Sequence, residues 1–372
     1  MIAVHQVTVA SKWARAYRQL AREIYADDPA APPSLPGCAS STTDDRQPFF
    51  GHGRGRSFIV VDGTRPVARA TGFLQPPAHN RERPAIGYIG HFESLRDPDA
   101  ARLALGAAVE WLAGAGATKA IGPVDFPTWN RHHLVTGGDG SRPFFLEPYN
   151  PSYYPDLFAA SGFAPEHRYV SRWATNLPEI VDQGRVAGEQ LRRAGFVLRP
   201  LDLRHSEDEL RLLYQLSRRI LAASALYEAC PYDEFRALYA GVRRLLPPRF
   251  AWIAHAPDGQ PAGFVCGVPD LTEPLRARHG RRWVLGAARY WWARNRVDTN
   301  VVLALGVVAE HRRTGLASWL ASVQQEQALR RGLTRSIQVC AVESSPDPNT
   351  TPGRGQPLRT YALYGRSVPA KG

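Results

Sequence analysis

The feature of this sequence that most constrains its fold is a weak internal repeat. The stretches 58–72 and 252–267 each read as a strand, a tight turn and a second strand. An Asp-Gly pair lies at each turn, at 62–63 and at 258–259, where glycine accepts the positive φ of a hairpin at little cost. Because repeated sequence indicates repeated structure, we expect two copies of one domain plan.

The order of elements after each hairpin also repeats. In the first half, a helix over 100–112 precedes a strand over 118–124. In the second half, a helix over 315–331 stops at Gly332 and precedes a strand over 334–342. Each half also opens with a strand that is followed by helical segments. This alternation predicts an α/β fold in which each half has a mixed central sheet flanked by helices.

These units set the expected domain boundaries. The N-terminal domain covers 1–176, a polar linker with room for a short helix covers 177–195, and the C-terminal domain covers 196–372. Hydrophobic residues make up 44% of the 372 residues, which is enough for a buried core in each domain. The second half is the longer one, and its excess falls in an arginine-rich insert at 271–296.

The strongest candidate for a binding site follows an apolar strand in the second half. The segment 301–308 is wholly apolar, and the basic turn at 309–317 that follows it runs into a helix. The first N–H groups of a helix have no intrahelical partner and lie at the positive end of the helix dipole, so such a turn suits an anion. Gly315 lets the backbone approach a phosphate closely, and Arg312 and Arg313 add positive charge.

These residues resemble the acyl-CoA signature of the GNAT acyltransferase superfamily, Gln/Arg-x-x-Gly-x-Gly/Ala. The match is Arg312-x-x-Gly315-x-Ala317, after an apolar strand and before a helix. The stretches 89–93 and 147–154 are similar to bacterial proteins with two tandem GNAT-like halves. The resemblance implies two tandem GNAT-like domains and acetyl-CoA or another acyl-CoA as co-substrate. It implies that the co-substrate is held by Gly306, Val307, Val308, Arg312, Arg313, Thr314, Gly315, Leu316, Ala317 and Asn349.

The matching loop in the N-terminal half does not have this signature. Between 93 and 99 it contains three carboxylates and Pro98 but no glycine, so it presents negative charge where a pyrophosphate would lie. Like charges repel, which disfavours an anion there. We therefore expect the N-terminal domain to be a degenerate copy that serves as a scaffold, and one acyl-CoA to bind per chain.

The C-terminal half departs from the family pattern after its strand at 334–342. In GNAT proteins a helix follows here, and it often begins with an asparagine and carries a tyrosine that protonates the leaving thiolate. In this chain the segment 344–357 contains four prolines and two glycines, which exclude a regular helix. The resemblance leaves Asn349 as the counterpart of the asparagine, and the helical tyrosine is missing.

The implied chemistry is direct attack of an amine on a thioester, which needs positioning and a base. Glu343 is the predicted base, because ligands of such sheets gather at strand ends, and a surface carboxylate without a role is the alternative. Tyr361 and Tyr364 are three apart on the last strand and so face opposite sides. One of the two tyrosines is predicted to replace the missing acid, and simple packing is the alternative.

The basic charge of the chain invites a polyanionic partner. The net charge is +12, and part of it falls in the insert, where basic residues alternate with aromatic ones. Such a pattern suits RNA, through phosphate contacts and stacking. It equally suits a half-buried helix whose aromatic rings pack and whose arginines reach to solvent, and we favour this interpretation. The residues concerned are Arg276, Arg278, Arg281, Arg282, Arg289, Arg294 and Arg296 with Trp283, Tyr290, Trp291 and Trp292.

Several classes of protein are not indicated. The four cysteines show neither metal-ligand nor disulfide spacing, and His132 and His133 have no cysteine or acidic partner at ligand spacing, so no metal is expected. No apolar run is long enough to span a membrane, and the first residues do not read as a secretory leader. We expect a reduced, cytoplasmic protein with no membrane partner.

The expected function is acyl-CoA-dependent N-acylation of a small-molecule amine, in a biosynthetic pathway. Two alternatives stay open. The first is a transferase that takes its acyl group from an aminoacyl-tRNA, as some two-domain GNAT proteins do. The second is a GNAT-like protein that binds a ligand without catalysis. The glycine-containing turn favours acyl-CoA, the basic insert favours tRNA, and the missing helix favours the non-catalytic alternative.

Overall fold

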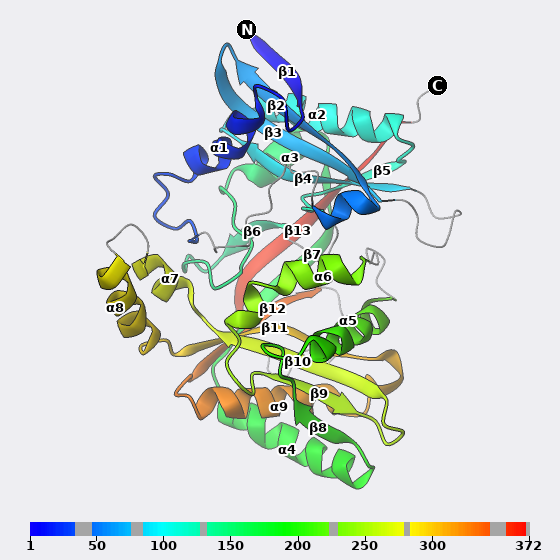
Figure 1. Cartoon of the computed structure of the whole chain (residues 1–372), viewed down its shortest axis with the longest axis vertical. Helices are drawn as coiled ribbons and strands as arrows, with labels where there is room; N and C mark the ends of the chain where they lie inside the picture. Colours follow the sequence, from blue (N-terminus) through cyan, green and yellow to red (C-terminus); the bar gives the residue numbers. More distant parts are fainter. Residues whose placement is uncertain are drawn as a thin grey trace.

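The structure, a computed structural model, describes residues 1–33, 47–75, 85–126, 132–222, 230–278, 283–342 and 355–369. Within these residues one mixed sheet runs through the whole molecule, with helices on both of its faces (Figure 1). The strands follow the order β1-β2-β3-β4-β5-β13-β7-β12-β11-β10-β9-β8, and β6 pairs with β13. The predicted α/β class is confirmed.

The elements fall into two halves. The strands of the N-terminal half are β1 (Ile2–Val7), β2 (Arg54–Asp62), β3 (Arg65–Leu74), β4 (Ile86–Ser94), β5 (Lys119–Gly122), β6 (Leu134–Gly138) and β7 (Ala164–Ala174), and its helices are α1 (Ala14–Ile24), η1 (Pro48–Gly51), α2 (Pro98–Gly114) and α3 (Tyr154–Ala160). The strands of the C-terminal half are β8 (Val197–Pro200), β9 (Ala251–His255), β10 (Pro261–Pro269), β11 (Thr299–Val307), β12 (Arg335–Val342) and β13 (Pro357–Ser367). Its helices are α4 (Leu177–Arg193), α5 (Glu207–Leu221), α6 (Tyr232–Tyr239), η2 (Val242–Arg244), α7 (Thr272–Arg278), α8 (Trp283–Arg294), η3 (Ala309–His311) and α9 (Leu316–Leu329).

Both predicted hairpins are present. The turn of β2–β3 contains Gly63 (φ 59°), and the turn of β9–β10 contains Gly259 (φ 81°). Glycine adopts this left-handed conformation without the steric cost that a Cβ brings. In the N-terminal half, α2 covers β2, β3 and β4 with a buried stripe of small and aliphatic side chains. The stripe consists of Ala100, Ala101, Ala104, Leu105, Ala108, Val109 and Leu112.

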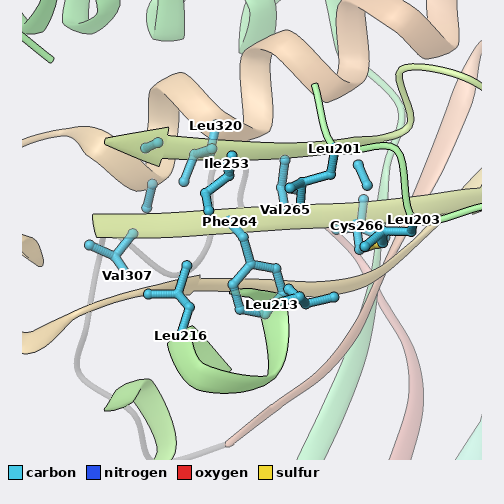
Figure 2. Close-up of a cluster of buried hydrophobic side chains, with 14 of the residues drawn as sticks. Leu201, Leu203, Leu213, Leu216, Ile253, Phe264, Val265, Cys266, Val307 and Leu320 are labelled. Carbon is cyan, nitrogen blue, oxygen red and sulfur yellow. The ribbon is translucent and has the colours of Figure 1, made fainter. Parts of the chain in front are cut away.

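The core of the C-terminal half lies on both faces of β10. Figure 2 shows Phe264 pointing toward Leu213 and Leu216 of α5, while Leu320 of α9 lies on the opposite side of the strands. Residues on β10 alternate between these two layers, as the period of a strand requires. Helices α5 and α6 therefore cover one face of this half, and α9 covers the other.

The last strand of each half pairs with the other half. β13 runs antiparallel to β5, with Tyr364 opposite Gly122, and β7 runs antiparallel to β12, with Trp173 opposite Ile337. β7 and β13 also pair with each other along most of their length. The two halves thus exchange their last strands and share one continuous hydrogen-bonded ladder.

The interval 177–195, expected to be a linker, is mostly the 17-residue helix α4, which packs on α9. Two glycines make this contact close. A Cβ on Gly184 would lie 2.2 Å from Ser322 Cβ, and a Cβ on Gly188 would lie 2.5 Å from Trp319 Cδ1. Because the glycines lie on the buried face of α4, the sequence there has no continuous apolar stripe and reads as polar.

We predict that Gly184→Ala destabilises the protein, because the new Cβ has no room against α9. We expect the free energy of unfolding to fall by about 1–3 kcal/mol, the usual scale for overpacking. The matched control is Gly106→Ala on α2, where a Cβ meets nothing within 4 Å. There, loss of unfolded-state freedom should raise stability by about 0.4–1 kcal/mol. Urea unfolding of both variants measures the difference, and equal effects would contradict the close contact.

Candidate functional site

β11 and β12 separate part-way along their length. They pair in parallel only over 299–302 and 335–338. Beyond this point β12 continues beside β7, while β11 stays beside β10 as far as Val307. Among the described strands, none pairs with the β12-facing edge of β11 from Leu303 onward. Backbone N–H and C=O groups on that edge can therefore bind a ligand that enters between the two strands.

A β-bulge and a buried amide cluster fix the place of separation. Leu303 is the extra residue of the bulge where β11 pairs with β10. Just before it, the amide of Asn300 donates to Gln324 Oε1 on α9 (3.0 Å) and to Ser336 Oγ on β12 (3.1 Å). All three side chains are fully buried or nearly so. A slip of β12 against β11 would leave buried polar groups without partners, which is costly.

Helix α9 follows the open edge of β11 after the short turn that contains η3. Its N-cap is Gly315, in a left-handed conformation (φ 85°). Within the described part of the chain, no side chain caps this helix and no acidic residue lies in its first turn. Leu316 and Ala317 of the first turn are buried, so their side chains anchor the helix. The first N–H groups are thus available to an anion at the positive end of the helix dipole.

The polar residues of the turn have different surroundings. The guanidinium of Arg312 is bonded to the backbone carbonyls of Val307 and Ile220, at 3.4 Å each. It therefore braces the turn against β11 and α5. Arg313 and Thr314 are exposed. Of the two arginines predicted to contact a pyrophosphate, Arg313 is the one whose side chain is exposed to solvent.

The corresponding helix of the N-terminal half is already capped. Asp97 Oδ1 accepts hydrogen bonds from the N–H groups of Asp99 (3.0 Å) and Ala100 (3.1 Å), at the start of α2. This carboxylate occupies the position that an anionic ligand would take. The geometry supports the interpretation of the N-terminal half as a scaffold.

The space between β4 and β5 is filled as well. These strands pair over 86–88 and 119–121, after which the chain continues beside β4. The N–H of Val124 donates to the carbonyl of Ile89 (2.8 Å), and a Cβ on Gly90 would lie 2.2 Å from the Val124 carbonyl oxygen. The protein's own backbone therefore takes the place that stays open between β11 and β12.

A buried polar chain lies where β7 and β13 cross between the halves. Tyr361 donates to Glu147 Oε1 (2.5 Å), and Arg359 Nε donates to the same oxygen (3.0 Å). Ser171 Oγ lies 3.0 Å from the Tyr361 hydroxyl and accepts from the Cys340 N–H at 3.2 Å. Burial raises the pKa of Glu147, and the Tyr361 and Arg359 contacts oppose the rise. Burial and the Glu147 charge raise the pKa of Tyr361, so its hydroxyl keeps its proton.

This series of buried hydrogen-bonded side chains ends in a cysteine–histidine pair. Cys340 Sγ lies 3.0 Å from His133 Nε2, and the His133 ring stacks on Tyr169 with centroids 5.0 Å apart. Cys340 and His133 both have positive φ, 50° and 61°. Burial raises the pKa of Cys340, so the thiol stays protonated beside the imidazole. The sequence around His133 favours a loop that lines the acceptor site over a metal pair, and it does not indicate this contact between positions 207 residues apart.

A second pair of titratable side chains joins the two halves, on the face of the sheet that α5 and α6 cover. His52 Nε2, just after η1, lies 2.7 Å from Glu234 Oε2 on α6. Glu234 is buried, which raises its pKa, and His52 opposes the rise. On the same helix, Phe235 shares a core cluster with Cys266, the β10 residue next to the bulge. A buried carboxylate next to a histidine is suited to proton transfer, and no local sequence pattern indicates this pair.

The two tyrosines predicted to be catalytic lie in different surroundings. Glu343 and Asn349 lie outside the described residues. Tyr361 belongs to the buried polar chain, whereas Tyr364 is buried in the N-terminal core with its ring 5.6 Å from that of Phe158. Their catalytic roles stay predictions. Within the described ranges, no group of three or more His, Cys, Asp or Glu side chains could hold a metal ion.

Solved structures share this architecture over the whole chain. A tandem GNAT protein from the clavulanic acid biosynthesis pathway aligns over 100% of both chains, with a TM-score of 0.57 and 12% identity. This chain has the tandem GNAT fold. A conserved protein of unknown function from Enterococcus faecalis V583 covers 100% of this chain and 73% of its own, with a TM-score of 0.59 and 10% identity. A GCN5-related N-acetyltransferase from Anabaena variabilis ATCC 29413 covers 99% and 73%, with a TM-score of 0.57 and 8% identity.

Two curated proteins are similar in sequence. Bacterial ceramide synthase of Caulobacter vibrioides is 23% identical over 303 residues, covering 79% of this chain and 78% of that protein. Protein YghO of Escherichia coli K12 is 21% identical over 372 aligned residues, covering 95% and 93%. No family model matches the chain.

We predict that Gly315→Glu raises the Kd for coenzyme A by about 100-fold or more, because a carboxylate then stands at the helix N-terminus. The matched control is Gly332→Glu at the other end of α9, which has the same backbone strain (φ 77°). It should bind normally. Calorimetry measures both variants, and wild type should saturate at one equivalent per chain. Unchanged affinity in Gly315→Glu, or saturation at two equivalents, would contradict the assignment.

We predict that Tyr361→Phe lowers the free energy of unfolding at pH 7 by about 1.5–3 kcal/mol, the scale of a hydrogen bond to a charged group. The pKa of Glu147 is already raised in the folded state, so its stabilising contribution is present below the unfolded value of 4.5 and is lost as pH rises through the folded value. Loss of the tyrosine donor raises that pKa further. The deficit of the variant should therefore grow from acid to neutral pH.

The same variant tests the proposed acid. If Tyr361 protonates the leaving group, kcat falls in Tyr361→Phe at temperatures where the variant stays folded. Tyr364→Phe tests the other predicted tyrosine in the same way, and a fall in kcat in that variant alone would move the acid to Tyr364. If the loss of unfolding free energy in Tyr361→Phe were instead independent of pH, the hydrogen bond to Glu147 would not be its cause.

Proposed function

We propose that this chain is an acyl-CoA-dependent N-acyltransferase with one acyl-CoA site, in its C-terminal half. The observation that carries the proposal is the junction of β11 and α9. An open strand edge leads there into a helix that, among the described residues, has no side-chain cap and no acid in its first turn. The same junction in the N-terminal half is closed by Asp97 and by the segment around Val124. An open edge suits a pantetheine arm and an uncapped helix suits a pyrophosphate, so both features fit one elongated thioester.

Each part of the junction has a role in this proposal. The free edge of β11 over 303–307 would hold the pantetheine arm, and the N–H groups at 315–317 would hold the pyrophosphate. Arg313 would add positive charge from its exposed position, while Arg312 braces the turn. The bound co-substrate supplies an acyl group that is already activated as a thioester.

The chain must also take a proton from the acceptor. An amine attacks only in its unprotonated form, and most alkylamines are protonated near neutral pH. Glu343 stays our predicted base. Within the described residues, the His52–Glu234 pair is a second candidate, because its carboxylate is buried next to an imidazole that can pass the proton to solvent. Separate substitutions at Glu343 and Glu234 distinguish the two.

The curated relatives suggest a class of acceptor. A ceramide is the amide of a fatty acid with a long-chain amino alcohol, and one relative is named bacterial ceramide synthase. We therefore propose a long-chain amino alcohol as acceptor and a fatty acyl-CoA as donor. This choice lies within the amine class expected from the sequence, and it places the reaction in lipid biosynthesis. A small polar amine with acetyl-CoA is the alternative pair of substrates.

A second candidate function, transfer from an aminoacyl-tRNA, is favoured by the net charge of +12. The uncapped start of α9 argues against it, because an aminoacyl-tRNA has no pyrophosphate to place there. The third candidate, a binding protein without catalysis, would take up coenzyme A and never turn it over.

The test is a reconstitution that measures release of the coenzyme A thiol and formation of the amide. Palmitoyl-CoA and acetyl-CoA are each offered with a long-chain amino alcohol and with a small polar amine. We expect turnover with palmitoyl-CoA and the long-chain acceptor. Glu343→Gln should lower kcat by about 100-fold or more if it is the base. Glu189→Gln, an exposed position on α4, is the matched control and should be normal.

Three outcomes decide between the candidates. Turnover that needs charged tRNA and stops on addition of ribonuclease would replace acyl-CoA with tRNA as donor. Binding of coenzyme A without turnover for any amine would favour the non-catalytic function. A normal kcat in Glu343→Gln together with a large loss in Glu234→Gln would move the base to α6.

A further inference from the structure

Helices α7 and α8, the described helices of the insert at 271–296, pack together as a helical hairpin that projects from the side of the molecule (Figure 1, yellow, at the left). It connects the end of β10 to the start of β11. It therefore lies at the opposite end of β11 from the turn at 309–317. Among the described elements, the main packing partner of α8 is α7. Helix α8 of the hairpin is therefore exposed to the surroundings of the protein.

The base of the hairpin is held by both halves of the protein. Asp270 Oδ1 accepts from the N–H groups of Phe145 (3.1 Å) and Thr272 (3.0 Å). Arg276 on α7 donates to the carbonyl oxygens of Pro29 and Ala30. Because these contacts come from different segments, they fix the direction in which the hairpin projects.

The exposed face of α8 carries two adjacent tryptophans. Trp291 is 57% exposed and Trp292 is 60% exposed. The expectation that the aromatic rings of the insert pack into the protein is wrong for these two. Arginines from the same segment lie over them: Arg296 is 3.6 Å from the Trp292 ring centre, and Arg294 is 5.1 Å from that of Trp291. Two neighbouring exposed indoles form an apolar patch that a partner can bury.

The net charge of the hairpin is strongly positive. The insert contains seven arginines and one acidic residue, Glu273, and α8 itself has no acidic residue. Arg289, Arg294 and Arg296 are exposed around the tryptophan patch. The surface that surrounds the patch therefore complements an anionic partner.

We propose that the exposed face of α8 docks on an anionic lipid bilayer. The rings of Trp291 and Trp292 lie at the level of the headgroups, and the flanking arginines pair with lipid phosphates. Tryptophan is enriched at membrane–water interfaces, and basic side chains beside an apolar helix face attract anionic lipids. The helix lies on the membrane, and no helix in the described residues is long and apolar enough to cross one. The proposal departs from the expectation of no membrane partner.

The composition of α8 favours lipid over RNA. Of its 12 residues only Arg289 and Arg294 are charged, and the rest are apolar or aromatic. A helix that tracks RNA phosphates needs several cations along its length. Arginines already lie over the indole rings, which leaves those rings less open to stack on bases. The rings remain suited to the headgroup region, where cations and indoles occur together.

The place of the hairpin deepens the proposed function, on which this step rests. The donor would enter at the α9 end of β11. A long-chain amino alcohol dissolves in membranes, and the hairpin would bring the opposite end of β11 next to the bilayer that holds it. Docking itself is measured without either substrate, so its failure is distinguishable from failure of the proposed function.

The experiment measures binding of the full chain to vesicles by flotation. One set contains equal parts phosphatidylglycerol and phosphatidylcholine, and the other contains phosphatidylcholine alone. We expect binding to the anionic set at low salt and its loss near 1 M salt, where the screening length is about 3 Å. Trp291→Ser with Trp292→Ser should lower the partition coefficient at least about tenfold. Neutralising Arg289, Arg294 and Arg296 to glutamine should lower it by about fivefold per residue.

The control is Val186→Ser with Arg193→Gln, an exposed apolar and basic pair on α4, and it should bind as wild type does. Quenching of tryptophan fluorescence by brominated lipid, lost in the double serine variant, would place the two rings in the interface. The proposal is overturned if wild type ignores anionic vesicles or if the double serine variant binds equally well. It is also overturned if the tryptophans instead control tRNA binding, or self-association in sedimentation without lipid.

Discussion

The exchange of β7 and β13 is the constraint on which the rest of the structure depends. A strand edge with unpaired backbone groups must be covered, and here the edges of β5 and β12 are each covered by a strand from the other half. Because β7 and β13 then pair with each other, neither half has a complete sheet of its own. The buried hydrogen bonds that join Arg359, Glu147 and Tyr361 lie along this seam. They therefore also form only when both halves are in place.

The two halves share one fold but differ at the junction between the central strand and the helix that follows it. In the C-terminal copy, β11 and β12 separate and α9 starts with a glycine, which leaves backbone donors for a ligand. In the N-terminal copy, Asp97 takes up the helix donors and the backbone around Val124 takes up the strand edge. The difference needs no change of fold. A few residues per loop decide whether the strand edge and the helix N-terminus of the same framework stay open or are closed by the protein itself.

Local features were predictable from sequence, and contacts between distant residues were not. The hairpin turns and the glycine at the start of α9 follow from backbone requirements that only certain residues meet. The pairs His133–Cys340 and His52–Glu234 join positions 207 and 182 apart, and no local pattern indicates them. The sequence of α4 indicates a polar linker with room for a short helix, because the contact face of α4 uses Gly184 and Gly188, which carry no apolar signal. For Trp291 and Trp292, periodicity predicts an amphipathic helix but does not say whether protein covers its apolar face.

The strand exchange also orders events during synthesis of the chain. Domains usually fold one after another as they leave the ribosome, the N-terminal one first. Here β5 and β7 must wait for β13, which is synthesised long after both. During that interval the nascent N-terminal half carries uncovered strand edges, the kind of surface that pairs with other chains. The single sheet is therefore complete only after translation of β13, and the yield of the protein in a cell depends on protecting those edges until then.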